Sequence, residues 1–100
     1  MTTAQSIIGE EMQAVMKYID AFFGSSKQIL ARSISGKNMS VIRAWKGLYS
    51  VSIGSPKEGT VAVVIRDRIR EGIISSKMFD SRSELFIADM NQHLEESGVI

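Results

Sequence analysis

The stretch Val63–Gly72, VVIRDRIREG, decides the fold because it fits both a strand and a helix. At a period of two, Arg66, Arg68 and Arg70 share one face of a strand and form a basic ribbon. At a period of 3.6, the apolar residues form one stripe of an amphipathic helix. That stripe consists of Val61, Ile65, Ile69 and Ile73.

The residues before this stretch favour the strand. Ser55-Pro56-Lys57-Glu58 matches a capping box with proline at the first helical position, which supports a helix. Gly59 falls inside that first turn, however, and β-branched residues then occupy five of the six positions 60–65. Such residues lose rotamer freedom in a helix and fit well on a pleated surface. We expect a strand over about 60–68, and its end stays open because helix formers and Gly72 follow.

Both ends of the chain have helical patterns. Apolar residues recur at spacings of three and four from Ile8 to Phe23, and Gly24 follows at the usual terminating position, which predicts a helix over about 4–23. Ser81-Arg82-Ser83-Glu84 is a capping box ahead of an apolar run that ends before Gly98, which predicts a helix over about 82–97.

The middle of the chain has the patterns of strands. QILARSIS and MSVIRAW flank a turn-forming Gly36-Lys37-Asn38, and LYSVSIG alternates strictly between apolar and small residues. We expect a single α+β domain in which an N-terminal helix, an antiparallel meander of about four strands and a C-terminal helix follow one another. Both helices should cover the same face of the sheet, because each has one apolar stripe.

The alternative fold is all-α with a helix-turn-helix. The tail HLEESGVI is similar to the end of a recognition helix in winged-helix regulators, and VIRDRIREGI resembles the first helix of some bacterial regulators. This resemblance implies that residues 64–73 form a helix, whereas the β-branched pattern predicts a strand over about 60–68.

Composition excludes several classes of protein. Apolar residues make up 44% and charged residues 23% of the 100-residue chain, which is too apolar for a disordered protein. No window approaches the roughly 20 apolar residues of a membrane span. The N-terminus lacks a basic start and a continuous apolar stretch, and the chain has no cysteine, so a cytosolic location without disulfides is expected.

Catalytic motifs are missing from the sequence. One histidine, His93, and no cysteine rule out a self-contained His/Cys metal site, and the acidic pairs on the predicted helices point in different directions. No nucleophilic serine motif or complete phosphate-binding loop occurs. We therefore expect a protein that is not an enzyme and that uses no metal or cofactor.

Basic and aromatic residues remain as the candidate binding residues. On the strand MSVIRAW, Arg43 and Trp45 share a face, and Lys46 lies on the other. The candidate contacts to a partner are Arg43, Trp45, Lys46, Arg66, Arg68 and Arg70. The leading hypothesis is a small accessory or inhibitory protein-binding module, with a partner of unknown identity. A homodimer is also expected, with a helix-to-helix seam made by Met12, Met16, Phe22 and Phe23.

The alternative function is nucleic-acid binding. Residues 27–82 hold eleven of the twelve Lys and Arg and only four of the eleven acids, although the net charge is only +1. Arginines beside an aromatic residue on a sheet are typical of proteins that bind single strands. An exposed ribbon of Arg66, Arg68 and Arg70 would match the spacing of successive phosphates.

Overall fold

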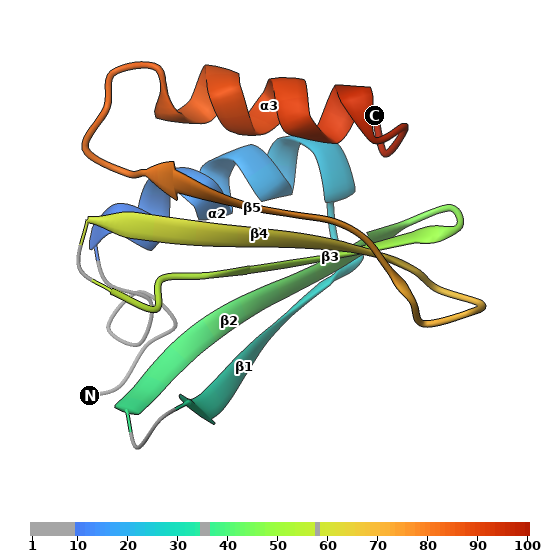
Figure 1. Ribbon diagram of the computed structural model, residues 1–100, viewed down its shortest axis with the longest axis horizontal. Helices are drawn as coiled ribbons and strands as arrows, with labels where there is room; N and C mark the ends of the chain where they lie inside the picture. Colours follow the sequence, from blue (N-terminus) through green and yellow to red (C-terminus); the bar gives the residue numbers. More distant parts are fainter. Residues whose placement is uncertain (1–9, 35–36, 58) are drawn as a thin grey trace.

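In the described part of the chain, two helices lie on one face of a five-stranded antiparallel sheet (Figure 1). The computed structural model describes residues 10–34, 37–57 and 59–100, and the side chains of 10, 11 and 31–39 are outside that description. The elements are α2 (Glu10–Phe23), β1 (Lys27–Ile34), β2 (Lys37–Lys46), β3 (Tyr49–Gly54), β4 (Thr60–Asp67), β5 (Ile73–Asp80) and α3 (Phe86–Glu96). The strands pair in the order β1-β2-β3-β4-β5, which confirms the α+β prediction and shows that the all-α alternative is wrong.

The ambiguous stretch is a strand only as far as Asp67. Val63 and Ile65 are fully buried, whereas Ile69 is 75% exposed, so the apolar residues follow the period of a strand. The Asp67 carboxylate then accepts the backbone N–H groups of Ile69 (2.8 Å) and Arg70 (3.0 Å), which fixes a turn. The ribbon predicted to carry Arg66, Arg68 and Arg70 on one strand face is therefore wrong, because the last two lie in this turn.

The sheet has one strand more than the sequence predicted. β5 pairs with β4 along its length, with Val61 opposite Phe79 and Ile65 opposite Ser75. A register shift beside Ile65 leaves Ile74 without a partner on β4. The sequence of β5 does not alternate between apolar and polar residues, because β5 is an edge strand in which Phe79 is the only buried residue.

The C-terminal helix begins later than predicted. Asp80 accepts the backbone N–H of Arg82 (2.9 Å), and the Ser83 hydroxyl accepts that of Leu85 (3.2 Å). Asp80, and Ser83 of the expected capping box, therefore stabilise turns over 81–85, and α3 starts at Phe86. Its N-cap, Leu85, makes no side-chain capping bond. A start at about residue 82 was wrong by one helical turn.

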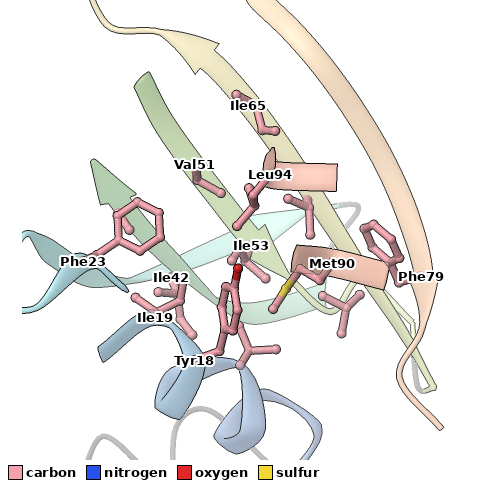
Figure 2. Close-up of a cluster of buried hydrophobic side chains, with 14 of the residues drawn as sticks. Tyr18, Ile19, Phe23, Ile42, Val51, Ile53, Ile65, Phe79, Met90 and Leu94 are labelled. Carbon is pink, nitrogen blue, oxygen red and sulfur yellow. The ribbon is translucent and has the colours of Figure 1, made fainter. Parts of the chain in front are cut away.

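The core lies between the helices and the sheet, where side chains of α2, α3 and four strands meet (Figure 2). Each large apolar side chain buried there contributes about 1.5–3 kcal/mol of transfer free energy. The Tyr18 hydroxyl donates to Asn91 Oδ1 at 2.6 Å and so links α2 to α3. Burial, with a smaller contribution from nearby Glu95, raises the pKa of Tyr18 to about 12. The largest fully enclosed side chains of the core are Met12, Val15, Ile19, Ile42, Val51, Ile53, Val61, Val63, Ile65, Met90 and Leu94.

The apolar stripe of α2 belongs mostly to this core. Met12 and Phe23 are 1% and 6% exposed, and Met16 packs against the core from its margin. Only Phe22, at 42% exposed, faces solvent, with its ring centroid 4.7 Å from that of Tyr18. α2 ends as predicted, because Gly24 adopts a φ of +58° and donates its N–H to the Asp20 carbonyl. Of the four residues predicted for a seam between two copies, only Phe22 is therefore exposed.

Candidate functional site

The sheet face opposite α2 and α3, called the open face below, is covered by neither helix (Figure 1). On this face β3 contributes only the small residues Ser50, Ser52 and Gly54, since its other residues alternate toward the core. The neighbouring strands contribute longer side chains. Ser50 is paired with Trp45 of β2 on one side and with Arg66 of β4 on the other. A small residue between two large ones lowers the surface along β3.

This arrangement produces a hollow of about 470 Å³ on the open face, called the β3 hollow below. Its lining comes from four strands and from the turn after β4. The lining residues are Gln28, Arg43, Trp45, Ser50, Arg66, Asp67, Arg68 and Glu71.

The arginines of the β3 hollow are exposed, and none of them has a carboxylate partner among the described residues. The ion pair between Lys27 and Asp20 lies on another part of the surface. Arg43 Nε donates to the Ser50 hydroxyl at 3.5 Å, a long hydrogen bond, and Arg66 makes no hydrogen bond with the described residues. Two guanidinium groups therefore flank Ser50, and apart from Arg43 Nε their donors have no partner in the described part of the chain.

Arg68 has a different role from Arg43 and Arg66, the other two arginines of the β3 hollow. Its Nη1 donates to the Gly47 carbonyl at 3.0 Å, and its backbone N–H donates to Leu48 at 2.9 Å. These bonds join the turn after β4 to the turn between β2 and β3. Arg68 thus fixes one end of the hollow while it contributes a positive charge.

Two carboxylates balance part of this charge. The backbone N–H groups of Arg70 and Ile69 lower the pKa of Asp67 by stabilising its ionised form. Both N–H groups bond to Oδ1, so these hydrogen bonds leave Oδ2 of Asp67 for other contacts. Glu71 has a φ of +59°, a left-handed conformation, and lies exposed on the same turn. The hollow is positive overall but carries both signs of charge.

The structure brings together four of the six predicted contact residues. Arg43, Trp45, Arg66 and Arg68 line the β3 hollow. Lys46 is exposed, but the alternation of β2 places it on the opposite side of the sheet from Arg43 and Trp45, and Arg70 lies outside the lining. The sequence analysis missed the floor at Ser50. Its position in LYSVSIG, opposite the apolar residues, was the signal that could have found it.

The single histidine is buried between α3 and β5. His93 is 5% exposed, its Nε2 lies 2.7 Å from the Ser75 hydroxyl, and its ring centroid is 5.7 Å from that of Phe79. Burial, together with the positive charge of Lys77, lowers the pKa of His93 and favours the neutral ring.

The contact between Ser75 and His93 has the spacing of a nucleophile and its base, but it lacks the third group. Nδ1 of His93 is buried and has no hydrogen-bond partner among the described residues, so no carboxylate orients the ring. The pair is best described as a polar link between α3 and β5.

No family model matches this chain, and neither the curated proteins nor the solved structures contain a match to it. Within the described residues, no three histidine or carboxylate side chains gather as metal ligands. None of the described helices is both long enough and apolar enough to cross a membrane. The function is therefore inferred from the geometry of the β3 hollow.

Proposed function

We propose that the protein is a non-enzymatic binding module whose β3 hollow receives a carboxylate-bearing segment of a partner protein. The observation that supports this most directly is the position of Arg43 and Arg66. Both side chains are exposed on either side of Ser50, and neither has a carboxylate partner among the described residues. An arginine binds a carboxylate through two parallel hydrogen bonds, so the pair suits one or two acidic side chains.

The mixture of charges favours a protein over a nucleic acid as the partner. Three arginines line the hollow, but Asp67 and Glu71 line it as well, and the whole chain has a net charge of only +1. A nucleic-acid backbone carries one negative charge per nucleotide, so carboxylates such as these repel it. A protein segment can match both signs. Trp45 is half-buried beside Arg43, and tryptophan and arginine are enriched at the energetic centres of protein interfaces.

The sheet also supports recognition because it is rigid. The three central strands that carry Trp45, Ser50 and Arg66 hold fully buried residues on their other face, so the backbone under the hollow is fixed by the core. A pre-organised site loses less entropy on binding than a mobile loop does. An accessory or inhibitory role fits a protein of this size that offers one rigid surface. The proposal includes a cytosolic location, which follows from the sequence expectation.

The intrinsic fluorescence of Trp45 provides the test, because it is the only tryptophan of the chain. A glutamate-rich peptide should change its emission in a saturable way, and a matched glutamine-rich peptide should not. Arg43→Gln and Arg66→Gln should each weaken binding by about 10- to 150-fold, as expected for a charged hydrogen-bonded pair of about 1.5–3 kcal/mol. Lys46→Gln is the matched control, since Lys46 projects from the other side of β2, and it should bind like the wild type.

Two results would contradict this proposal. One is the absence of any saturable change with the acidic peptide at low salt. The other is an equal loss of binding in Lys46→Gln and Arg66→Gln, which would indicate a general effect of net charge rather than a site.

A second candidate function is the binding of single-stranded nucleic acid, which Trp45 favours. Its ring lies beside Arg43 on an open sheet, as in proteins that stack bases and neutralise phosphates. With three arginines in the hollow, binding should involve about two or three phosphates, and log K should fall with log salt at a slope of about −1.4 to −2.1. Fluorescence anisotropy of labelled oligonucleotides at ~50 mM salt measures this, and unchanged anisotropy would exclude the candidate.

A further inference from the structure

The sheet has a free edge at β5 with exposed apolar side chains. Ile73, Ile74 and Met78 are 61%, 47% and 57% exposed, and they make up three of the seven large apolar residues that the described surface exposes. The other edge strand, β1, contributes none of these seven among its described side chains. Figure 1 shows β5 at the outer side of β4, below α3.

No described residue pairs with the backbone groups that β5 presents at this edge. Ser81 donates its N–H to the Gly59 carbonyl, so these two residues form a hydrogen-bonded pair between the strand ends. Hydrogen-bonded pairs recur at every second position of an antiparallel ladder, so Phe79, Lys77 and Ser75 also form such pairs with β4. The N–H and C=O groups of these three residues therefore point toward β4. The groups of Ser76 and Met78 therefore point outward, away from the sheet, and another strand can pair with them.

The edge is open to pairing over 75–80. Proline does not occur in β5, and the bulge of this strand lies at Ile74, before the regular ladder of 75–80. The positive charge of Lys77 does not guard the open face, because its Nζ lies on the helix side, 5.5 Å from the Phe79 ring centroid. Natural edge strands are normally protected along their length by charges, bulges or proline, so this regular part of β5 can serve as a template for another strand.

We propose that β5 pairs with β5 of a second copy of this chain, antiparallel about a two-fold axis at Ser76. In this register Ser76 lies opposite Ser76 of the second copy, and the ladder ends where the side chain of Met78 meets that of the bulged Ile74 of the second copy. The two-fold axis repeats the apolar contact, so the surface is complementary to itself. The proposal uses an edge that the β3 hollow does not touch, and it goes beyond the proposed function.

The neighbouring registers are less favourable. A shift of two in one direction places Lys77 opposite Lys77 of the second copy, where like charges repel. A shift of two in the other direction places Met78 opposite Gly72, and both apolar contacts are lost. A shift of one residue in either direction places backbone groups that point toward β4 opposite backbone groups that point outward, so the two strands cannot form hydrogen-bonded pairs. Pairing at Ser76 produces a ten-stranded sheet from two copies of five strands, with both β3 hollows on one face.

Disulfide trapping tests the register directly, because the chain has no cysteine of its own. Hydrogen-bonded residues opposite one another in antiparallel strands have Cα atoms about 5.5 Å apart, which is within the range of a disulfide. Ser76→Cys should therefore form a cross-linked dimer on mild oxidation. Lys77→Cys, one residue along, is the matched control and should not, because its two copies are diagonal neighbours. Efficient cross-linking of Lys77→Cys but not of Ser76→Cys would overturn the proposed register.

The oligomeric state tests the interface itself. Light scattering should show a species of twice the 11.0 kDa chain mass at high micromolar concentration. Met78→Lys should raise the dimer Kd about tenfold or more, since it places a charge in the apolar contact. Leu85→Lys changes a similarly exposed apolar residue away from the edge and should leave the Kd unchanged. Circular dichroism verifies that both variants keep the fold.

Either of two results would overturn the proposal. The wild type could remain a monomer across the whole concentration range, or it could dimerise while folded Met78→Lys dimerises equally well. Neither result affects binding of an acidic peptide to the β3 hollow, so the two proposals fail independently.

Discussion

The two faces of the sheet use the same strands for different purposes. On the covered face, Val51 and Ile53 of β3 are fully buried beneath the helices. On the open face, Ser50 and Ser52 of the same strand form a low surface between larger side chains. Because side chains alternate along a strand, one set of residues can stabilise the fold while the next set is free to recognise a partner. Substitutions on the two faces should therefore have separable effects.

The largest difference should appear between Ile53→Ala and Val64→Ala. Ile53 is fully enclosed at the centre of the core, so its truncation leaves a cavity and should lower the free energy of unfolding by about 2–5 kcal/mol. Val64 lies half-buried on the open face of β4, so its truncation should cost less than about 1 kcal/mol. Urea denaturation of the two variants measures both values. Similar losses would show that the open face is covered in solution.

A smaller effect is expected from Tyr18→Phe, which tests how the two helices of the covered face are joined. The variant keeps the ring in the core and removes only the hydroxyl that donates to Asn91. The loss should be about 0.5–1.5 kcal/mol, the usual net value of one hydrogen bond. Thermal unfolding provides the measurement. Asn91→Ala in the Tyr18→Phe background should then cost nothing further through this bond, and additive losses would contradict the coupling.

The pH dependence of stability tests the polar link beneath α3. Burial and Lys77 lower the pKa of His93 below its usual value of 6.5, whereas the ring in the unfolded chain keeps that value. Below pH 6.5 the unfolded state therefore binds more protons, and the free energy of unfolding should fall until the pH passes the folded pKa. His93→Gln should remove this decline. Asp67 does not interfere, because its lowered pKa moves its own contribution below pH 3.8. An unchanged profile in His93→Gln would contradict the assignment.

The predictability of each element from the sequence depended on how much of it is buried. The stripe of α2 and the alternation in β3 were readable because one side of each faces the core. β5 was missed because nearly all of its residues are exposed at the edge, so burial imposes no period on them. The start of α3 was misplaced because Asp80 and Ser83 have capping chemistry but bond to turns instead.

The candidate site was predictable only in part for a related reason. Alternation alone placed Arg43 and Trp45 on one face of β2. Their proximity to Arg66 depends on the register of three strands, in which Ser50 pairs with both Trp45 and Arg66. Register is set by turn geometry and by the buried face, and neither can be read from the basic residues themselves.

The smallest expected change concerns the two arginines that differ most in their contacts. Arg66 has no bonded partner among the described residues, so Arg66→Gln should change the free energy of unfolding by less than about 0.5 kcal/mol. Arg68 donates to the Gly47 carbonyl and joins two turns, so Arg68→Gln should cost up to about 1 kcal/mol. Matched urea titrations measure both variants. If Arg66→Gln lowers the free energy of unfolding more than Arg68→Gln does, the Arg66 side chain stabilises the sheet and is not available to bind a partner. If the expected order is found while Arg66→Gln also loses the acidic peptide, the open face contributes recognition at almost no cost to the fold, because the buried residues of the same strands already hold the backbone in place.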